Sequence, residues 1–108
     1  MPVMYGEAAT AGWKQVVDGV HAEGGRIMPQ IWHLGVARRE GAAPYPDAPI
    51  MTPSGIGPSG SPRGVEASLA DIDEIIASFA RAAATAKEIG FDGVELHGAH
   101  GYLLDAFL

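Results

Sequence analysis

The amino-acid sequence predicts an α/β fold built on a parallel sheet. Two amphipathic stretches, expected to be helices, alternate with two short apolar stretches, expected to be strands. Glycine follows each helical stretch just before the next apolar run begins. Strands that alternate with helices form βαβ units, in which the connecting helix returns the chain so that the strands run parallel.

The first helix is expected from about Glu7 to Glu23. Apolar side chains recur there at the 3.6-residue spacing of one helix face: Trp13, Val16, Val17 and Val20. Gly24-Gly25 ends the helix, since glycine accepts a left-handed conformation cheaply. His21 lies in the last turn, where a donor suits the carbonyl end of a helix, and we interpret it as structural.

A buried strand is expected over residues 26–33, although Pro29 cannot donate to a sheet ladder. Residues 35–66 are rich in Gly, Pro, Ser and Ala without a period, and they predict a long structureless loop. Such a loop of about thirty residues usually carries function, the alternative being a disordered linker. Arg38, Arg39 and Glu40 are interpreted as a solvated face of this loop.

The second helix is expected to begin after Ser68, an N-cap residue with Asp71 three positions on. Its apolar face is Leu69, Ile72, Ile75, Ile76, Phe79, Ala83, Ala86 and Ile89. Gly90 ends it, and residues 91–96 start a second strand. Two strands cannot cover or close a parallel sheet, so we expect the chain to be part of a larger α/β fold such as a (β/α)₈ barrel, typically of about 250 residues.

Composition excludes several classes of protein. The 108 residues carry a net charge of −6 without a basic stripe, which argues against nucleic acid or an anionic membrane surface as partner. Cysteine is absent, so no disulfide or thiolate chemistry is expected, in keeping with a cytoplasmic location. No apolar run approaches the ~20 residues of a membrane span.

The residues best suited to chemistry are His97, His100 and Tyr102, which follow the second strand. Functional groups gather at the C-terminal ends of strands in parallel α/β folds. Two imidazoles that converge on a carbonyl or nitro oxygen stabilise negative charge there, and a tyrosine can protonate a carbanion-like carbon. None of them can supply a hydride, so a redox reaction would need a cofactor.

Other interpretations stay open for these residues. His97 and His100 can be a metal site completed by Glu95 or His33, or a structural pair bonded to backbone. Tyr102 can be a packed aromatic whose hydroxyl is satisfied.

Gln30 is the second candidate, because a carboxamide both donates and accepts and can read the edge of a flavin or another heterocycle. Its alternative is a buried glutamine bonded to neighbouring backbone. Trp32 is interpreted as core, and His33 as a structural hydrogen-bonding residue.

Residues 90–104, GFDGVELHGAHGYLL, resemble the fourth-strand motif of Old Yellow Enzyme-type NADH:flavin oxidoreductases. Residues 30–35, QIWHLG, resemble the third-strand motif, and Pro53–Ile56 resemble the "PS" element of the following loop. Residues 12–25 fit the segment between the second and third strands. The resemblance thus spans nearly the whole chain in the family's order.

The resemblance implies a (β/α)₈ barrel that binds FMN and uses NADH or NADPH to reduce activated alkenes or nitro compounds. His97 and His100 would match the pair that binds the electron-withdrawing oxygen of the small-molecule substrate, and Tyr102 the proton donor. Gln30 would match the glutamine that hydrogen-bonds the flavin. No metal is expected.

Two positions depart from the family pattern. Val36 stands where arginine usually follows the glycine, so another loop path is expected, and Ala106 stands where glutamine is usual. The resemblance also places the family's first strands before this chain and its phosphate-binding strands after it. We therefore expect residues 1–108 to be an internal fragment of a single FMN-binding barrel domain, inactive alone. The alternatives are a non-catalytic remnant and a metal-dependent barrel hydrolase.

Overall fold

The computed structural model describes residues 2–108, which fall into two units. The first unit runs to Ile31 and resumes over Ile75–Leu96, and the second comprises Trp32–Glu74 and His97–Leu108. Each strand that leaves the first unit therefore continues directly into the second, where the predicted chemistry lies.

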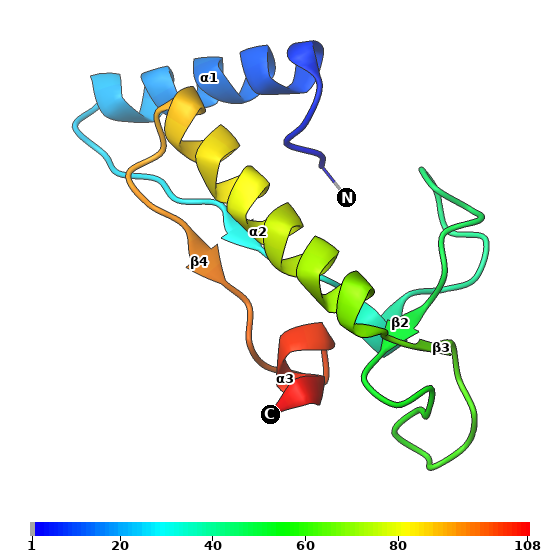
Figure 1. Ribbon diagram of the computed structural model, residues 1–108. Coiled ribbons are helices and arrows are strands. Elements are labelled where there is room, and N and C mark those ends of the chain that lie inside the picture. Colours follow the sequence, from blue (N-terminus) through cyan, green and yellow to red (C-terminus); the bar gives the residue numbers. More distant parts are fainter. Residues whose placement is uncertain (1) are drawn as a thin grey trace. The chain divides into compact units, whose positions relative to one another are not determined.

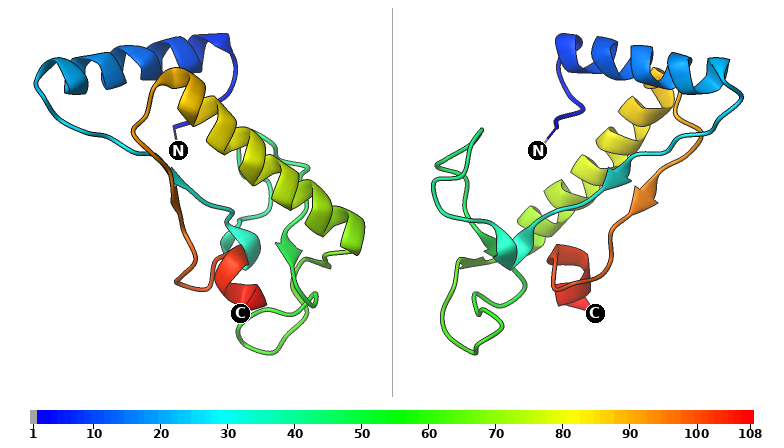
Figure 2. Two further views of the ribbon diagram at one scale, coloured as in Figure 1. Left: turned by 60° about the vertical axis from the view of Figure 1, so that its left-hand side comes forward. Right: turned by 180° about the vertical axis from the view of Figure 1, so that it is seen from behind.

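The first unit contains the predicted βαβ arrangement (Figure 1). Its elements are helix α1 (Glu7–Ala22), strand β1 (Gln30–Ile31), most of helix α2 (Leu69–Ile89) and strand β4 (Glu95–Leu96). Strands β1 and β4 pair in parallel, Gln30 opposite Glu95 and Ile31 opposite Leu96, as the cyan and orange arrows of Figure 2 show. The parallel pairing confirms the predicted topology, whereas both strands are shorter than predicted.

Pro29 comes directly before β1 and does not weaken the ladder. Its carbonyl accepts a hydrogen bond from the Glu95 N–H at 3.0 Å. This bond does not need the backbone N–H that proline lacks. Just before this point, a Cβ on Gly93 would lie 2.9 Å from the sulfur of the exposed Met28 side chain, which is flexible and can move aside.

The apolar faces of the two helices supply the core of the first unit. Its most buried side chains are Val17, Ala86 and Ile89. The Trp13 ring contacts that of Phe91 at 6.1 Å, and its indole N–H donates to the Val3 carbonyl. The predicted faces are thus correct at these positions, but they are wrong at Val16, Leu69 and Ile76, which stay exposed.

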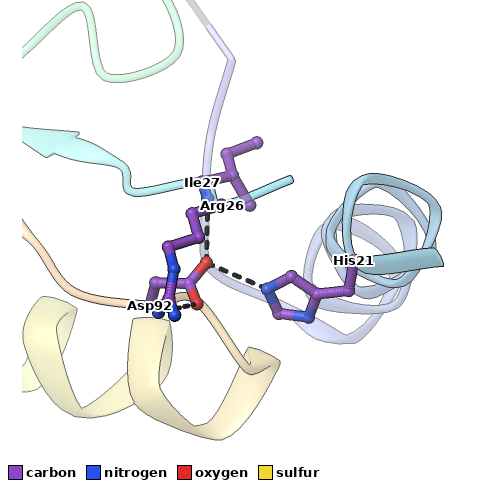
Figure 3. Close-up of polar contacts among 4 residues, drawn as sticks. All are labelled: His21, Arg26, Ile27 and Asp92. Atoms are coloured by element: carbon purple, nitrogen blue, oxygen red, sulfur yellow. Dashed lines mark hydrogen bonds and ion pairs between the residues drawn. The ribbon is translucent and has the colours of Figure 1, made fainter. Parts of the chain in front are cut away.

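Asp92 joins three segments of the first unit (Figure 3). Its Oδ2 accepts hydrogen bonds from the His21 imidazole at 2.9 Å and from the Ile27 N–H at 2.8 Å. The Arg26 guanidinium lies 3.7 Å from Oδ1. The carboxylate thereby ties the end of α1 to the segments that lead into β1 and β4. This contact confirms His21 as a structural residue.

The second unit corrects the prediction of a structureless loop over residues 35–66. This stretch forms a 3₁₀ turn, η1 (Gly35–Ala37), and two strands, β2 (Met51–Thr52) and β3 (Val65–Glu66), that pair in parallel. An antiparallel bridge joins Ile56 to Pro62. The prediction was wrong because these pairings depend on contacts across a turn-rich sequence that carries no period of its own.

Arg38 and Arg63 hold this stretch together through its backbone carbonyls. Arg38 donates to Ala42 at 3.1 Å, to Ala48 at 3.4 Å and also to Tyr45. Arg63 donates to the carbonyls of Val36 and Arg38 at 2.9 and 3.0 Å. The interpretation of Arg38 as a solvated residue was therefore wrong.

The start of helix α2 follows the sequence prediction. The Asp71 N–H donates to the Ser68 hydroxyl at 3.2 Å, and Asp71 Oδ2 accepts from the Ser68 N–H at 2.9 Å. These two bonds satisfy donors that the first turn of a helix leaves unpaired. Asp71 thus performs the part usually taken by glutamate in a capping box.

A short helix, α3 (Leu103–Phe107), ends the second unit and was not predicted. Leu103 is fully buried and shares the core of this unit with Ile50 and Thr52. A Cβ on Gly35 would lie 3.0 Å from the Leu103 backbone, so α3 packs directly on the η1 turn. This packing fixes where the segment between β4 and α3 ends.

Candidate active site

The second unit brings His97, His100 and Tyr102 together on the segment that joins β4 to α3. The His97 ring lies edge-to-face with the Tyr102 ring at a centroid distance of 4.8 Å. The His97 and His100 rings are 5.3 Å apart in a similar arrangement. The three side chains therefore form one cluster, with His97 between the other two.

Trp32 completes this cluster from the residue that follows β1. Its indole meets the Tyr102 ring edge-to-face at 4.7 Å and stacks on the His97 ring at 6.0 Å. Trp32 is only half-buried. The interpretation of Trp32 as a core residue was wrong in this respect, because its contacts are with the candidate catalytic side chains. Its position two residues after Gln30 in the third-strand motif was the available signal.

The backbone between His97 and Tyr102 turns sharply. His100 has φ 62° and Gly101 has φ 73°, two consecutive residues in the left-handed region. The Tyr102 N–H donates to the Ala99 carbonyl at 3.3 Å, which closes the turn. This turn presents His100 and Tyr102 beside the ring of His97.

A backbone hydrogen bond sets the tautomer of neutral His97. The Ala99 N–H donates to His97 Nδ1 at 3.3 Å, so this nitrogen must offer a lone pair. The proton of the neutral ring then resides on Nε2. In the neutral ring, Nε2 of His97 is therefore the hydrogen-bond donor.

His33 is a structural residue, as predicted. Its Nδ1 accepts from the Gly35 N–H at 3.1 Å, and its carbonyl accepts from the Leu103 N–H at 3.1 Å. Burial, reinforced by the positive charge of Arg38, lowers the pKa of His33 below its ordinary value. The neutral imidazole suits this accepting role, and the carbonyl of His33 ties the segment after β1 to α3.

Gln30 lies in the first unit, where Glu95 orients its side chain. Gln30 Nε2 donates to Glu95 Oε1 at 3.0 Å, between residues that face each other in the β1–β4 register. A carboxylate can only accept, so it selects the amide end of Gln30. Within residues 2–108 the Gln30 side chain makes no other hydrogen bond, so its carbonyl oxygen and second N–H offer one acceptor and one donor. The alternative of a backbone-bonded, buried Gln30 was wrong, because its partner is a side chain and the residue is exposed.

Three other kinds of feature were expected or possible: a metal site, a membrane span and a pocket. Within residues 2–108, no group of three or more His, Cys, Asp or Glu side chains is arranged to hold a metal ion. No helix in the described part of the chain has the length and apolarity to cross a membrane. An open hollow of about 300 Å³ in the first unit is lined by residues of α1 and α2, among them Lys14, Thr85 and Ile89, and includes none of the predicted site residues.

Known proteins are similar to this chain in sequence and in fold. The sequence profile of the NADH:flavin oxidoreductase / NADH oxidase family matches residues 1–108. A 12-oxophytodienoate reductase 7 of Oryza sativa subsp. japonica is 43% identical, with 100% of this chain and 30% of the relative covered. The structure of morphinone reductase in complex with tetrahydroNAD matches with a TM-score of 0.81 and 34% identity over 95% of this chain and 32% of that chain. Old Yellow Enzyme from Pichia sp. AKU4542 matches with a TM-score of 0.84 and 30% identity over 94% of this chain and 29% of that chain.

The chain thus spans about 30% of the length of the curated relatives it matches. Its parallel β1–β4 pair and crossing helix correspond to part of the barrel of the Old Yellow Enzyme-type structures, which confirms the predicted fold class. The family uses FMN. The profile match and the structural matches agree over the whole sequence, and the chain belongs to the NADH:flavin oxidoreductase / NADH oxidase family, which includes the Old Yellow Enzymes.

Proposed function

We propose that this chain serves in the FMN-dependent reduction of activated alkenes, such as enones, and of nitro compounds, with NADH or NADPH as reductant. The observation that carries the proposal is the cluster of His97, His100 and Tyr102 within one unit. Two imidazoles and a phenol at this spacing match what reduction of a polarised double bond requires of a protein.

The two histidines would bind the electron-withdrawing oxygen of the substrate. His97 carries its proton on Nε2 when neutral, because Nδ1 accepts from the Ala99 N–H. A second donor from His100 would share the negative charge that develops on the oxygen as the β-carbon receives a hydride. This binding also orients the double bond for addition.

Tyr102 would then deliver a proton to the α-carbon. The product is the saturated ketone, and the phenolate left on Tyr102 recovers its proton from solvent. Trp32 packs on the Tyr102 ring at 4.7 Å and restricts its orientation, which favours transfer to one position.

Gln30 would hold the flavin through its carbonyl oxygen and its remaining N–H, with the amide oriented by Glu95. Bound FMN, once reduced by NADH or NADPH, would supply the hydride that none of these side chains can provide. The contacts support this assignment because a carboxamide with one free donor and one free acceptor fits the edge of the isoalloxazine ring.

The relatives support the same reaction class. Morphinone reductase is in complex with tetrahydroNAD, a nicotinamide analogue, and the 12-oxophytodienoate reductases are named for the reduction of an oxo-diene acid. We propose that both units belong to one FMN-binding barrel domain with a small-molecule substrate, in a cytoplasmic protein that binds no nucleic acid.

The first experiment is an absorbance spectrum of the 108-residue chain after FMN is added and the excess removed. We expect weak retention or none, because a flavin phosphate is held mainly by backbone N–H groups and cationic side chains, and the phosphate-binding residues implied by the family resemblance are not in this sequence. A retained and perturbed flavin band would call for an immediate test of enone reduction by this chain.

A chimaera tests the function itself. Residues 1–108 would replace the matching third of morphinone reductase, which then supplies the rest of the barrel. Retained flavin and reduction of 2-cyclohexenone would support the proposal. A chimaera that folds and retains FMN but reduces no alkene would favour a non-catalytic remnant.

A further inference from the structure

The turn that carries two candidate catalytic residues is conformationally demanding. His100 has φ 62°, in a region that residues with a Cβ rarely adopt, and Gly101 follows with φ 73°. Such a conformation persists only where neighbouring contacts hold it. The contacts at this turn therefore decide where His100 and Tyr102 point.

Asp105 makes the shortest of these contacts. Its Oδ2 accepts a hydrogen bond from the Gly101 N–H at 2.7 Å. Asp105 is the third residue of α3, the position from which capping carboxylates reach back toward the residue before the helix. Here the bond reaches one residue further, into the turn itself, and the negative charge strengthens it.

The other side of Tyr102 is anchored as well. The Leu103 N–H donates to the His33 carbonyl at 3.1 Å, and the Leu103 side chain is fully buried. Tyr102 thus lies between two backbone amides that are both hydrogen-bonded. His33 holds the Leu103 amide, and Asp105 holds the Gly101 amide. Loss of either bond frees one side of the tyrosine backbone.

We propose that Asp105 is a positioning residue, whose carboxylate holds the Gly101 amide and so aims Tyr102 and His100 at the substrate. This inference rests on the proposed function, because it gives Asp105 its effect through the proton donor. Asp105 itself is half-buried beneath the turn, and the hydrogen bond that it accepts comes from the Gly101 backbone and not from either of the two side chains.

A plain helix cap is the competing explanation, and the chain offers a matched control for it. Asp71 is the third residue of α2 and accepts from the Ser68 N–H at 2.9 Å. D71A therefore removes a carboxylate-to-backbone bond of the same kind at the other helix. D105N provides the conservative variant, since an amide oxygen accepts the same hydrogen bond without the charge.

The structural part is measured on the 108-residue chain by amide hydrogen exchange. D105A is expected to speed exchange at Gly101 by about tenfold or more, because the loss of one charge-assisted hydrogen bond is of that size. D71A should leave the exchange rate of Gly101 near that of the wild type, and D105N should lie between the wild type and D105A, because its amide oxygen keeps the bond but not the charge. Unchanged protection of Gly101 in D105A would overturn the anchoring contact, whatever the chain's activity.

The functional part uses the morphinone reductase chimaera, with flavin reduction and flavin reoxidation by 2-cyclohexenone measured separately. D105A is expected to slow reoxidation by about 10- to 100-fold, the size of effect that a small misplacement of a catalytic group produces, and to leave reduction by the nicotinamide unchanged. D105N should recover most of the rate. D105A added to Y102F should cost nothing more, because the proton donor that Asp105 aims is already gone.

The outcomes separate this inference from the proposed function. If the parent chimaera reduces the enone and D105A matches it, or if D71A slows reoxidation equally, Asp105 is only a cap and the function stands. If D105A and Y102F lower the rate additively, Asp105 does not act through Tyr102. If the flavin-loaded parent reduces no alkene, the proposed function falls and the positioning role falls with it.

Discussion

Asp92 and His21 lie 71 positions apart in the chain and are joined by a hydrogen bond of 2.9 Å between Oδ2 and Nε2. The same oxygen accepts the Ile27 N–H. One carboxylate therefore closes the first unit by connecting the end of α1 with the two segments that enter the parallel strands (Figure 3). The pairing of β1 with β4 places Gln30 opposite Glu95, so this closure also supports the candidate flavin contact.

Removing the Asp92 carboxylate should destabilise the first unit. D92A loses three partners at once and leaves the Ile27 N–H without its acceptor. We expect a lower unfolding temperature by circular dichroism. D18A is the control, because within residues 2–108 Asp18 forms an ion pair only with Lys14, on the exposed face of α1, and its loss should change stability little. Equal losses in the two variants would contradict the role of Asp92.

This contribution of Asp92 should disappear in acid. The hydrogen bond from His21, followed by that from Ile27, lowers the pKa of Asp92 below its ordinary 3.8. Above about pH 5 the carboxylate is ionised in both the folded and the unfolded states, and the full contribution is present. As the pH falls, the Asp92 carboxylate is protonated first in the unfolded state. When the pH falls through the lowered pKa, the carboxylate is protonated in the folded state too, and the contribution is lost. Urea midpoints of wild type and D92N should therefore differ at about pH 7 and converge once the pH has fallen through the lowered pKa of Asp92; a gap that persists there would exclude the charge as its cause.

Gly35 should not tolerate a side chain. G35A would place a Cβ 3.0 Å from the Leu103 backbone, at a residue with φ 56°. G41A is a matched control, since Gly41 has φ 68° and no atom lies within 4 Å of the position that a Cβ would take there. Both variants strain the backbone, but only G35A displaces α3, and we expect it to lose about 1–3 kcal/mol more stability. Equal unfolding free energies would show that α3 accommodates the methyl group.

Tyr102→Phe should separate the two half-reactions in the chimaera. Without the phenolic proton, reoxidation of the flavin by 2-cyclohexenone should slow by about 100-fold or more, because general acid catalysis contributes on that order. Reduction by NADH or NADPH should stay at the parent rate, since it needs no proton donor. Stopped-flow absorbance measures both, and an equal loss in the two steps would remove Tyr102 from the role of proton donor.

His97→Ala and His100→Ala should each weaken the binding of phenol to the oxidised chimaera. A phenolate oxygen takes the place of the substrate oxygen, and loss of one hydrogen bond to a charged group costs about tenfold in affinity. Flavin difference spectra report the dissociation constant. H33A and H21A are not suitable controls, because His33 contacts Gly35 and His21 bonds Asp92. K14A, on the exposed face of α1, should leave phenol binding intact. Unchanged affinity in H97A and H100A would exclude both as ligands of the oxygen.

Glu95→Ala should lower the affinity of the chimaera for FMN through Gln30. Without the carboxylate, the Gln30 amide is free to rotate and offers the flavin the wrong end part of the time. E95Q is the matched variant, since its amide oxygen can accept the same bond, and it should bind FMN more tightly than E95A. Quenching of flavin fluorescence gives both constants; if E95A binds FMN as tightly as the parent, Glu95 does not orient Gln30.

The sequence by itself determined the helices and the grouping of the candidate catalytic residues. The 3.6-residue spacing of apolar side chains is a local property, and it predicted α1 and α2 with their glycine ends and the Ser68–Asp71 cap. The motif after the second strand placed His97, His100 and Tyr102 at one strand end, where a parallel fold collects its functional groups. These features depend on residues within a few positions of one another.

Only the tertiary structure decided what holds those residues in place. The β2–β3 pair, the arginine contacts to loop carbonyls, and the meeting of Trp32 with Tyr102 join residues far apart in the chain, and no local period announces them. The same holds for Glu95 beside Gln30, which follows from strand register. A sequence specifies which groups are available. Hydrogen-bond partners and ring contacts depend on which distant backbone segments pack together. Side-chain burial and strand pairing over the whole unit decide this packing.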